Sequence, residues 1–229
     1  MTVDALIGAV RSTLVAAADP ARAPAMQAYM KSAMPYYGVS LPDLRRACRP
    51  VFAEHPLGTA AEFEDAVRRL FTGAGHREER YAAIALARER RYRMYQMPAR
   101  VPLYAQLVVA GAWWDTVDEI ASNLLGPILL GHPAEVRPTV RDWIHSPDLW
   151  LRRTSIIVQL SFAERTDLDL LTEAIDANAG DTDFFIRKAI GWALRQYART
   201  DPDWVRAYVA DHRDRLSPLS VREALKHLG

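Results

Sequence analysis

Apolar residues recur every three to four positions along nearly the whole chain, and strict alternation of apolar and polar residues is almost absent. This period is typical of amphipathic helices, because positions i, i+3, i+4 and i+7 share one face. Helix breaks recur at short intervals, and in several of them Asp or Ser precedes a proline that suits the first helical turn. The breaks are Asp19-Pro20, Leu41-Pro42, His55-Pro56, Thr72-Gly73, Met97-Pro98, Gly126-Pro127, His132-Pro133, Ser146-Pro147, Asp201-Pro202 and Ser217-Pro218. We therefore predict an all-α chain.

The spacing of the helices becomes regular from about residue 97. Helix pairs are predicted near 98–124, 133–162, 167–198 and 202–228, which gives a repeat of roughly 30 to 35 residues. Stacked helix pairs of this length build HEAT-like solenoids with a continuous core and a concave face. No Gly/Ser linker divides the chain. We expect a single HEAT-like repeat domain over 1–229, with less regular helices in 1–70.

Composition excludes several classes of protein. A formal net charge of +1 argues against an indiscriminate polybasic binder. No apolar stretch approaches the roughly 18 to 20 residues of a membrane span, and the N-terminus lacks a signal-peptide pattern, so we expect a cytoplasmic protein. The single cysteine, Cys48, cannot form an internal disulfide. We predict no metal and no cofactor.

Arginine dominates the basic residues. Of the 29 basic residues only Lys31, Lys188 and Lys226 are lysines. The basic clusters are Arg45-Arg46-Arg49, Arg88-Arg90-Arg91-Arg93, Arg152-Arg153 and Arg187-Lys188 with Arg195. Arginine forks match phosphate oxygens, so a stripe from several helices could follow a nucleic-acid backbone. Alternatively these are solvated faces paired with glutamate, which the Arg-Glu-Glu-Arg run at 77–80 fits well.

The segment Trp113-Trp114-Asp115-Thr116-Val117-Asp118 places two indoles and two carboxylates at the start of a helix. Trp114 and Asp118, at i and i+4, project from one face, while Trp113 and Val117 share the next. An aromatic wall beside a carboxylate suits a cationic partner. The alternative is a core tryptophan beside a solvated aspartate.

Two later segments combine aromatic residues with basic ones. Trp150-Leu151-Arg152-Arg153-Thr154 begins a helix whose free amides and basic side chains could meet a phosphate. In the run 183–195, Arg187, Gly191 or Trp192, and Arg195 recur at helical spacing, so an indole would sit between cationic groups on one face. Gly191 within that helix implies a close approach, most often by a neighbouring helix.

No segment matches a nucleotide-binding glycine loop, a metalloprotease helix or a nucleophile elbow. The six histidines fall mostly at predicted helix ends or in loops, and none is assigned to catalysis. These observations favour chemistry that needs only a carboxylate and an aromatic environment.

Over nearly its whole length the chain resembles the AlkD-type DNA alkylation repair glycosylases, which are built of HEAT-like repeats. Four segments in matching order carry the resemblance. They are Met30-Lys31 through Pro35-Tyr36-Tyr37-Gly38-Val39, the run 113–118, the run 150–154, and Asp183 through Trp192.

The resemblance implies that Asp118 is the catalytic carboxylate, that Trp114 and Trp192 line a cleft against the sugar of the lesion, and that Arg153 contacts a phosphate. It also implies excision of N3- and N7-alkylated purines from double-stranded DNA, by a monomer and without flipping of the damaged base. Further phosphate contacts are expected from Arg152, Arg187, Lys188 and Arg195. We expect the protein at the nucleoid.

The alternative from another class is a non-catalytic HEAT-like scaffold that binds DNA or protein. Such a scaffold could keep its arginines, but it would have little need for a carboxylate that repels phosphate. The joint presence of Trp114, Asp118, Arg153 and Trp192 therefore favours an enzyme.

Overall fold

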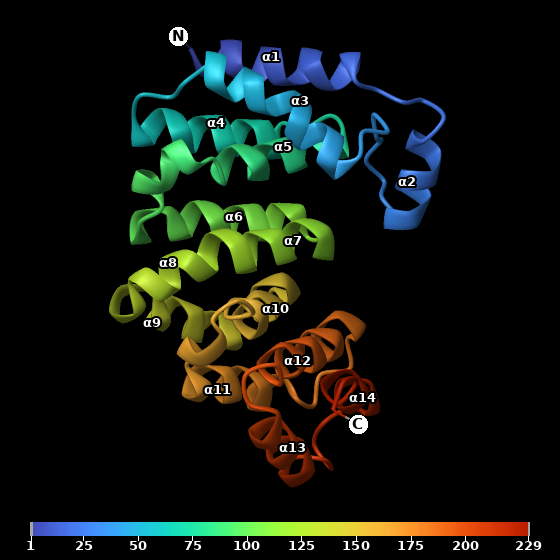
Figure 1. The fold of residues 1–229 in the computed structure, drawn as a ribbon, viewed down its shortest axis with the longest axis vertical. Coiled ribbons are helices and arrows are strands. Elements are labelled where there is room, and N and C mark those ends of the chain that lie inside the picture. Colours follow the sequence, from blue (N-terminus) through green and yellow to red (C-terminus); the bar gives the residue numbers. More distant parts are fainter. Residues whose placement is uncertain (1, 229) are drawn as a thin grey trace. The chain divides into compact units, whose positions relative to one another are not determined.

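The computed structural model describes residues 2–228 and divides into two compact units, Met1–Gln96 (unit 1) and Met97–Gly229 (unit 2). Within residues 2–228 it contains fourteen α-helices and no β-strand. Figure 1 shows the order of the helices along the chain. This confirms the all-α prediction, and the succession of helix pairs is that of a helical-repeat solenoid. None of the helices in 2–228 is both long and apolar enough to cross a membrane. A single domain over the whole chain stays a prediction.

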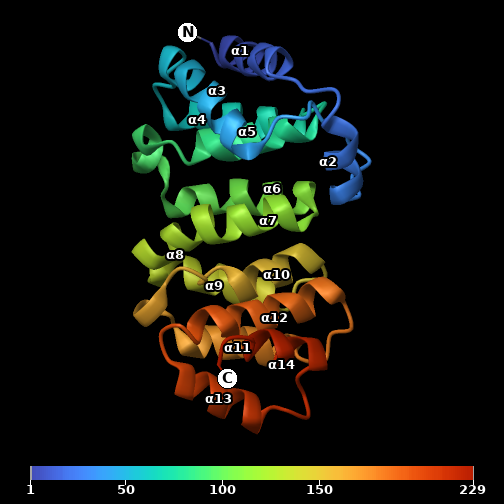
Figure 2. The same ribbon diagram turned by 45° about the vertical axis from the view of Figure 1, so that its right-hand side comes forward.

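Unit 1 contains five α-helices and a basic 3-10 segment. They are α1 (Val3–Ala16), α2 (Ala23–Met30), α3 (Leu41–Glu54), α4 (Ala60–Thr72), α5 (Arg77–Ala87) and η1 (Arg90–Tyr95). Helix α1 packs on α3 and α4, and α4 packs along α5 (Figure 2). The fully buried side chains of Phe52, Phe63 and Phe71 fill the space between these helices.

Unit 2 contains the regular helix pairs that the spacing predicts. Its elements are η2 (Pro98–Arg100), α6 (Val101–Gly111), α7 (Trp114–Ile120), η3 (Ala121–Leu125), α8 (Gly126–Gly131), α9 (Pro133–Ile144), α10 (Leu149–Ile157), η4 (Ala163–Arg165), α11 (Leu168–Asn178), α12 (Phe184–Tyr197), α13 (Pro202–Asp211) and α14 (Pro218–Ala224). The pairs α6/α7, α9/α10, α11/α12 and α13/α14 match the four predicted pairs. Helix α12 also packs closely on α10 and α14.

Side-chain caps fix where the helices of unit 2 begin. Asp201 and Ser217, each followed by proline, accept hydrogen bonds from first-turn amides of α13 and α14, as the sequence predicts. Asp148 accepts from two amides of α10, and Asp183 accepts from the Phe185 amide of α12. These two caps hold the ends of α10 and α12 that carry the candidate site.

The prediction that Gly126-Pro127 ends a helix is wrong. The helical path continues from α7 into α8 through η3, a π-helical turn in which the Gly126 amide donates to the Ala121 carbonyl. This wider turn relieves the clash between a proline ring and the preceding carbonyls. Glycine is needed for another reason, because a Cβ at position 126 would lie 2.6 Å from the Val158 carbonyl oxygen.

Candidate active site

Asp118 and Arg153 form a buried ion pair with two hydrogen bonds. Asp118 lies near the end of α7, and Arg153 lies in the middle of α10. Nε of Arg153 donates to Oδ1 of Asp118 and Nη2 donates to Oδ2, each over 2.8 Å. The side chains are 5% exposed for Arg153 and 15% exposed for Asp118. Two parallel N–H···O bonds fix the plane of the carboxylate as well as its position.

A third bond from Arg153 brings in a further helix. Its Nη1 donates to the carbonyl oxygen of Phe185, in the first turn of α12, over 2.6 Å. The ring of Phe185 packs against Trp113 and Trp150, with centroids 5.2 and 5.0 Å away. One guanidinium and one aromatic cluster therefore join α7, α10 and α12.

The environment of Asp118 opposes its ionisation, and Arg153 favours it. Burial raises the pKa of the Asp118 carboxyl above its ordinary value of 3.8, while the hydrogen bonds and charge of Arg153 lower it. The nearby carboxylates of Asp115 and Glu119 raise the pKa of Asp118 further. The Arg153 guanidinium thus favours the ionised form of Asp118 against the effects of burial and of the neighbouring carboxylates.

The two tryptophans of the first segment have different environments. Trp113 packs in the aromatic cluster with Trp150 and Phe185, and Val117 on the same face is fully buried, but Trp113 itself is partly exposed. Trp114, one helical turn before Asp118, is partly exposed. Trp192, on α12, is also partly exposed. That Trp114 and Trp192 line a cleft stays a prediction.

The predicted phosphate contacts Arg152 and Arg187 both hold the loop before α12. Arg152 Nη2 pairs with the Asp181 carboxylate over 3.0 Å, and Arg187 Nε donates to the Asp181 carbonyl over 2.8 Å. Both side chains remain partly exposed. The Asp181 carboxylate therefore partly neutralises Arg152, whereas Arg187 donates to a neutral acceptor.

Lys188 and Arg195 share one carboxylate. Glu223 of α14 pairs with Lys188 Nζ over 2.8 Å and with Arg195 Nη1 over 2.5 Å. Gly191 lies between them on α12, where a Cβ would approach the Glu223 Cβ to 2.5 Å. The expectation that a neighbouring helix explains Gly191 is confirmed. Through Glu223 these two cations bind α12 to α14, which is a packing role that the sequence did not predict.

Arg153 also differs from its expected environment. It is nearly buried, and three of the five N–H groups of its guanidinium already have protein acceptors. The structure therefore places it as a support of Asp118, and phosphate contact through its two remaining N–H groups stays a prediction.

Comparisons with known proteins show the family of the chain. The model of a family described as DNA alkylation repair enzyme matches residues 10–228. The chain belongs to the DNA alkylation repair enzyme family. Among solved structures it is similar to a predicted DNA alkylation repair enzyme from Enterococcus faecalis, with 32% identity and a TM-score of 0.77 over 93% of this chain and 97% of that one. A search of curated proteins found no match. The chain is thus a DNA alkylation repair enzyme whose substrate is DNA.

In this DNA alkylation repair enzyme, buried glutamates hold the N-terminal segment 35–40. Glu78 is fully buried and accepts hydrogen bonds from the backbone amides of Tyr37, Gly38 and Val39 over 2.8–3.1 Å. Glu79, 2% exposed, accepts from the hydroxyl of Tyr37. Burial and Glu79 raise the pKa of Tyr37 to about 12. The interpretation of the 77–80 run as a solvated face is therefore wrong, because backbone amides solvate its carboxylates in place of water.

The sequence identified the charged residues of the site but not the groups to which its arginines are hydrogen-bonded. The Phe185 carbonyl has no side-chain signal, and Asp181 and Glu223 lie 28 or 29 residues from the arginines they bind. Helical periodicity relates only residues within a few turns, so it could not reveal these pairs.

Proposed function

We propose that this enzyme is a DNA glycosylase that hydrolyses the N-glycosidic bond of N3- and N7-alkylated purines in duplex DNA. The observation that supports the proposal best is a carboxylate, Asp118, which Arg153 orients through two bonds, one helical turn after a partly exposed indole, Trp114. An alkylated purine is already cationic, so it can depart without protonation by a general acid. A carboxylate beside an aromatic side chain is therefore sufficient for the hydrolysis of such a substrate.

In the proposed reaction the bond between C1′ and the base nitrogen breaks, and its electron pair neutralises the departing base. The sugar becomes oxocarbenium-like, and Asp118 stabilises its positive charge. A water molecule adds to C1′, and its proton passes to Asp118 and then to solvent. An ionised carboxylate has about four lone-pair sites, of which Arg153 uses two, so the others remain for water and sugar.

Trp114 and Trp192 would hold the deoxyribose by contacts between its C–H groups and the ring faces, which also favour a developing cation. Contact with the sugar does not require the damaged base to enter a pocket, so we propose excision without base flipping. Because Lys188 is held by Glu223, we propose hydrolysis alone, without a covalent intermediate on an amine. No metal takes part in these steps.

Duplex DNA would be held through its phosphates, without sequence readout. Arg187 is the strongest of the predicted contacts, because its bonded partner is a neutral carbonyl. Arg152, Lys188 and Arg195 would contribute less, since each already pairs with a carboxylate. We propose a monomer that works at the nucleoid.

The decisive experiment measures release of N7-methylguanine from a methylated duplex by the wild type and by Asp118→Asn. Binding to the same duplex is measured in parallel. Asp142→Asn is the matched control, because this aspartate is exposed on α9. We expect Asp118→Asn to lose most excision and keep much of its DNA affinity, while the control behaves as the wild type.

Equal release by the wild type and Asp118→Asn would disprove the mechanism. Binding without release by either protein would instead indicate a non-catalytic scaffold. A duplex containing uracil provides a second test, because a neutral base needs an acid to activate it. Efficient uracil release would therefore contradict the proposed chemistry.

A further inference from the structure

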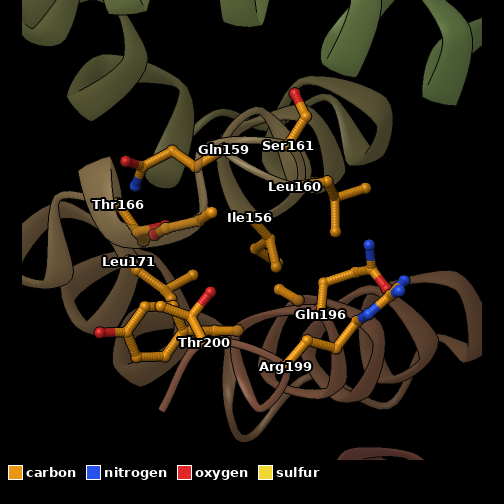
Figure 3. Close-up of a pocket in the computed structure, with 12 residues that line it drawn as sticks. Ile156, Gln159, Leu160, Ser161, Thr166, Leu171, Gln196, Arg199 and Thr200 are labelled. Atoms are coloured by element: carbon orange, nitrogen blue, oxygen red, sulfur yellow. The ribbon is translucent and has the colours of Figure 1, made fainter.

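A cavity of about 220 Å³ lies in unit 2, away from the residues proposed for catalysis. It is lined by the end of α10 and the turn after it, the start of α11, and the C-terminal part of α12 with the turn that follows it (Figure 3). None of Trp114, Asp118, Arg153 and Trp192 lines it. At about 30 Å³ for each water in the liquid, its volume corresponds to roughly seven water molecules, or one small organic group.

The floor of the cavity is apolar. Ile156, Leu171 and Ala193 line it, and they are 1%, 3% and 5% exposed. Water against such a surface finds few hydrogen-bonding partners, so displacing it with an apolar group is favourable. One wall is fixed, because both ends of the Gln159 amide are bound to the backbone of Asp167.

Two polar side chains at the rim have no partner within residues 2–228. Gln196 lies in the last turn of α12 and Arg199 in the turn that follows it, and Figure 3 shows their polar ends side by side. Neither makes a side-chain hydrogen bond or ion pair in that part of the chain. A guanidinium next to an amide offers several donors in one place, which matches a carboxylate.

The part of the rim at Tyr197 discourages an anion. Tyr197 lines the cavity, and its pKa is raised by burial and by the carboxylates of Asp201 and Glu164. The rim is therefore negative near Tyr197, where Asp201 and Glu164 lie, and positive at Arg199. A bound anion would turn toward Arg199.

The rim also contains backbone strain. Ala163 has φ +51°, a left-handed conformation that residues other than glycine adopt only at a cost in free energy. The hydroxyl and amide of Thr166 both donate to the Ala163 carbonyl and hold this turn in place. Strained residues that neighbours hold in place cluster at ligand sites.

We propose that this cavity binds an apolar group that bears a carboxylate, with the apolar part over Ile156, Leu171 and Ala193 and the carboxylate on Arg199 and Gln196. The same chemistry can come from a small organic acid or from the apolar C-terminal residue of another polypeptide. The site is separate from the proposed glycosylase chemistry and does not depend on it.

The test titrates the full-length protein with benzoate and, as a neutral control, benzamide. Methyl NMR signals of Ile156, Leu160 and Leu171 report occupancy of the cavity without any measurement of excision. We expect saturable shifts with benzoate and much weaker ones with benzamide. The tripeptide Ala-Ala-Phe, with a free or an amidated carboxyl terminus, forms the second arm. Tighter binding of the free tripeptide than of benzoate supports a polypeptide source, and the reverse supports a small acid.

Arg199→Gln is the informative variant, because this side chain is exposed and its removal leaves the core intact. We expect about a tenfold loss of benzoate affinity, as for one charge-assisted contact. Arg213→Gln, also exposed in unit 2 but outside the cavity, should bind benzoate like the wild type. The absence of saturable shifts, equal binding of benzamide, or no effect of Arg199→Gln would overturn the proposal.

Discussion

Replacing Arg153 with methionine tests whether its guanidinium supports Asp118 or serves only as a contact for DNA. The variant removes three hydrogen bonds and leaves Asp118, 15% exposed, without its cation. Loss of one partner of a buried ion pair destabilises proteins by about 3–5 kcal/mol. Because Asp118 keeps some access to water, we expect a loss of about 3 kcal/mol in the free energy of unfolding at pH 7.

The assay is urea denaturation of the wild type, Arg153→Met, Asp118→Asn and the double variant. Since each single change leaves one buried group unsatisfied, the double variant should be more stable than additivity predicts, with a coupling energy of about 2 kcal/mol. The pH dependence gives an independent measure. Without Arg153 the pKa of Asp118 rises further, so the contribution of this one group to stability is greatest below pH 3.8 and is lost as pH rises through its folded-state pKa. Arg153→Met should therefore regain more stability on acidification than the wild type does.

Two results would refute this reasoning. One is additivity of the two single changes to within about 0.5 kcal/mol, which is the behaviour of independent sites. The other is an Arg153→Met variant that unfolds like the wild type and differs only in DNA affinity and its salt dependence. That pattern would indicate that Arg153 contacts a DNA phosphate and does not support Asp118.

Three further predictions concern packing and charge in unit 2. Gly191→Ala should lower the free energy of unfolding by about 2 kcal/mol in a urea titration, because its Cβ would meet Ser220 and Glu223 of α14. Ala112→Gly should raise it by about 0.5 kcal/mol in the same titration, since Ala112 ends α6 in a left-handed conformation with φ 41°. Lys188 and Arg195 lower the pKa of Glu223 below its ordinary 4.5, so its stabilisation is present above 4.5 and is lost as pH falls through the folded-state pKa. Glu223→Gln should therefore lose less stability than the wild type in denaturation curves between pH 5 and 3.

The fold was predictable where it depends on local sequence. Helix starts at Asp201-Pro202 and Ser217-Pro218 follow from capping, and the helix pairs of unit 2 follow from the apolar period. The prediction that a helix ends at Gly126-Pro127 was wrong, because this dipeptide is typical of a helix break. The deciding fact was tertiary, since the carbonyl of Val158 lies against position 126.

The candidate site was predictable only in part. Asp118 stands out because an aromatic residue precedes it by one turn, and Arg153 stands out within a basic cluster. Their pairing spans 35 residues, so no local pattern could reveal it. The same reason explains Glu78, whose run of charged neighbours suggests a solvated face. Its backbone amide partners lie 39 to 41 residues earlier in the chain.

The pairing of Asp118 with Arg153 also answers an electrostatic objection to the proposed chemistry. A lone carboxylate would repel the phosphates of the DNA that it must approach. The ion pair has no net charge, so the approach of DNA is not opposed at long range. At short range the carboxylate still presents its remaining lone pairs to a sugar that becomes positive, and there the interaction with Asp118 is favourable. Asp118→Asn leaves the Arg153 charge uncompensated, so this variant should bind undamaged duplex at least as tightly as the wild type in a fluorescence anisotropy titration. Weaker binding by that variant would contradict it.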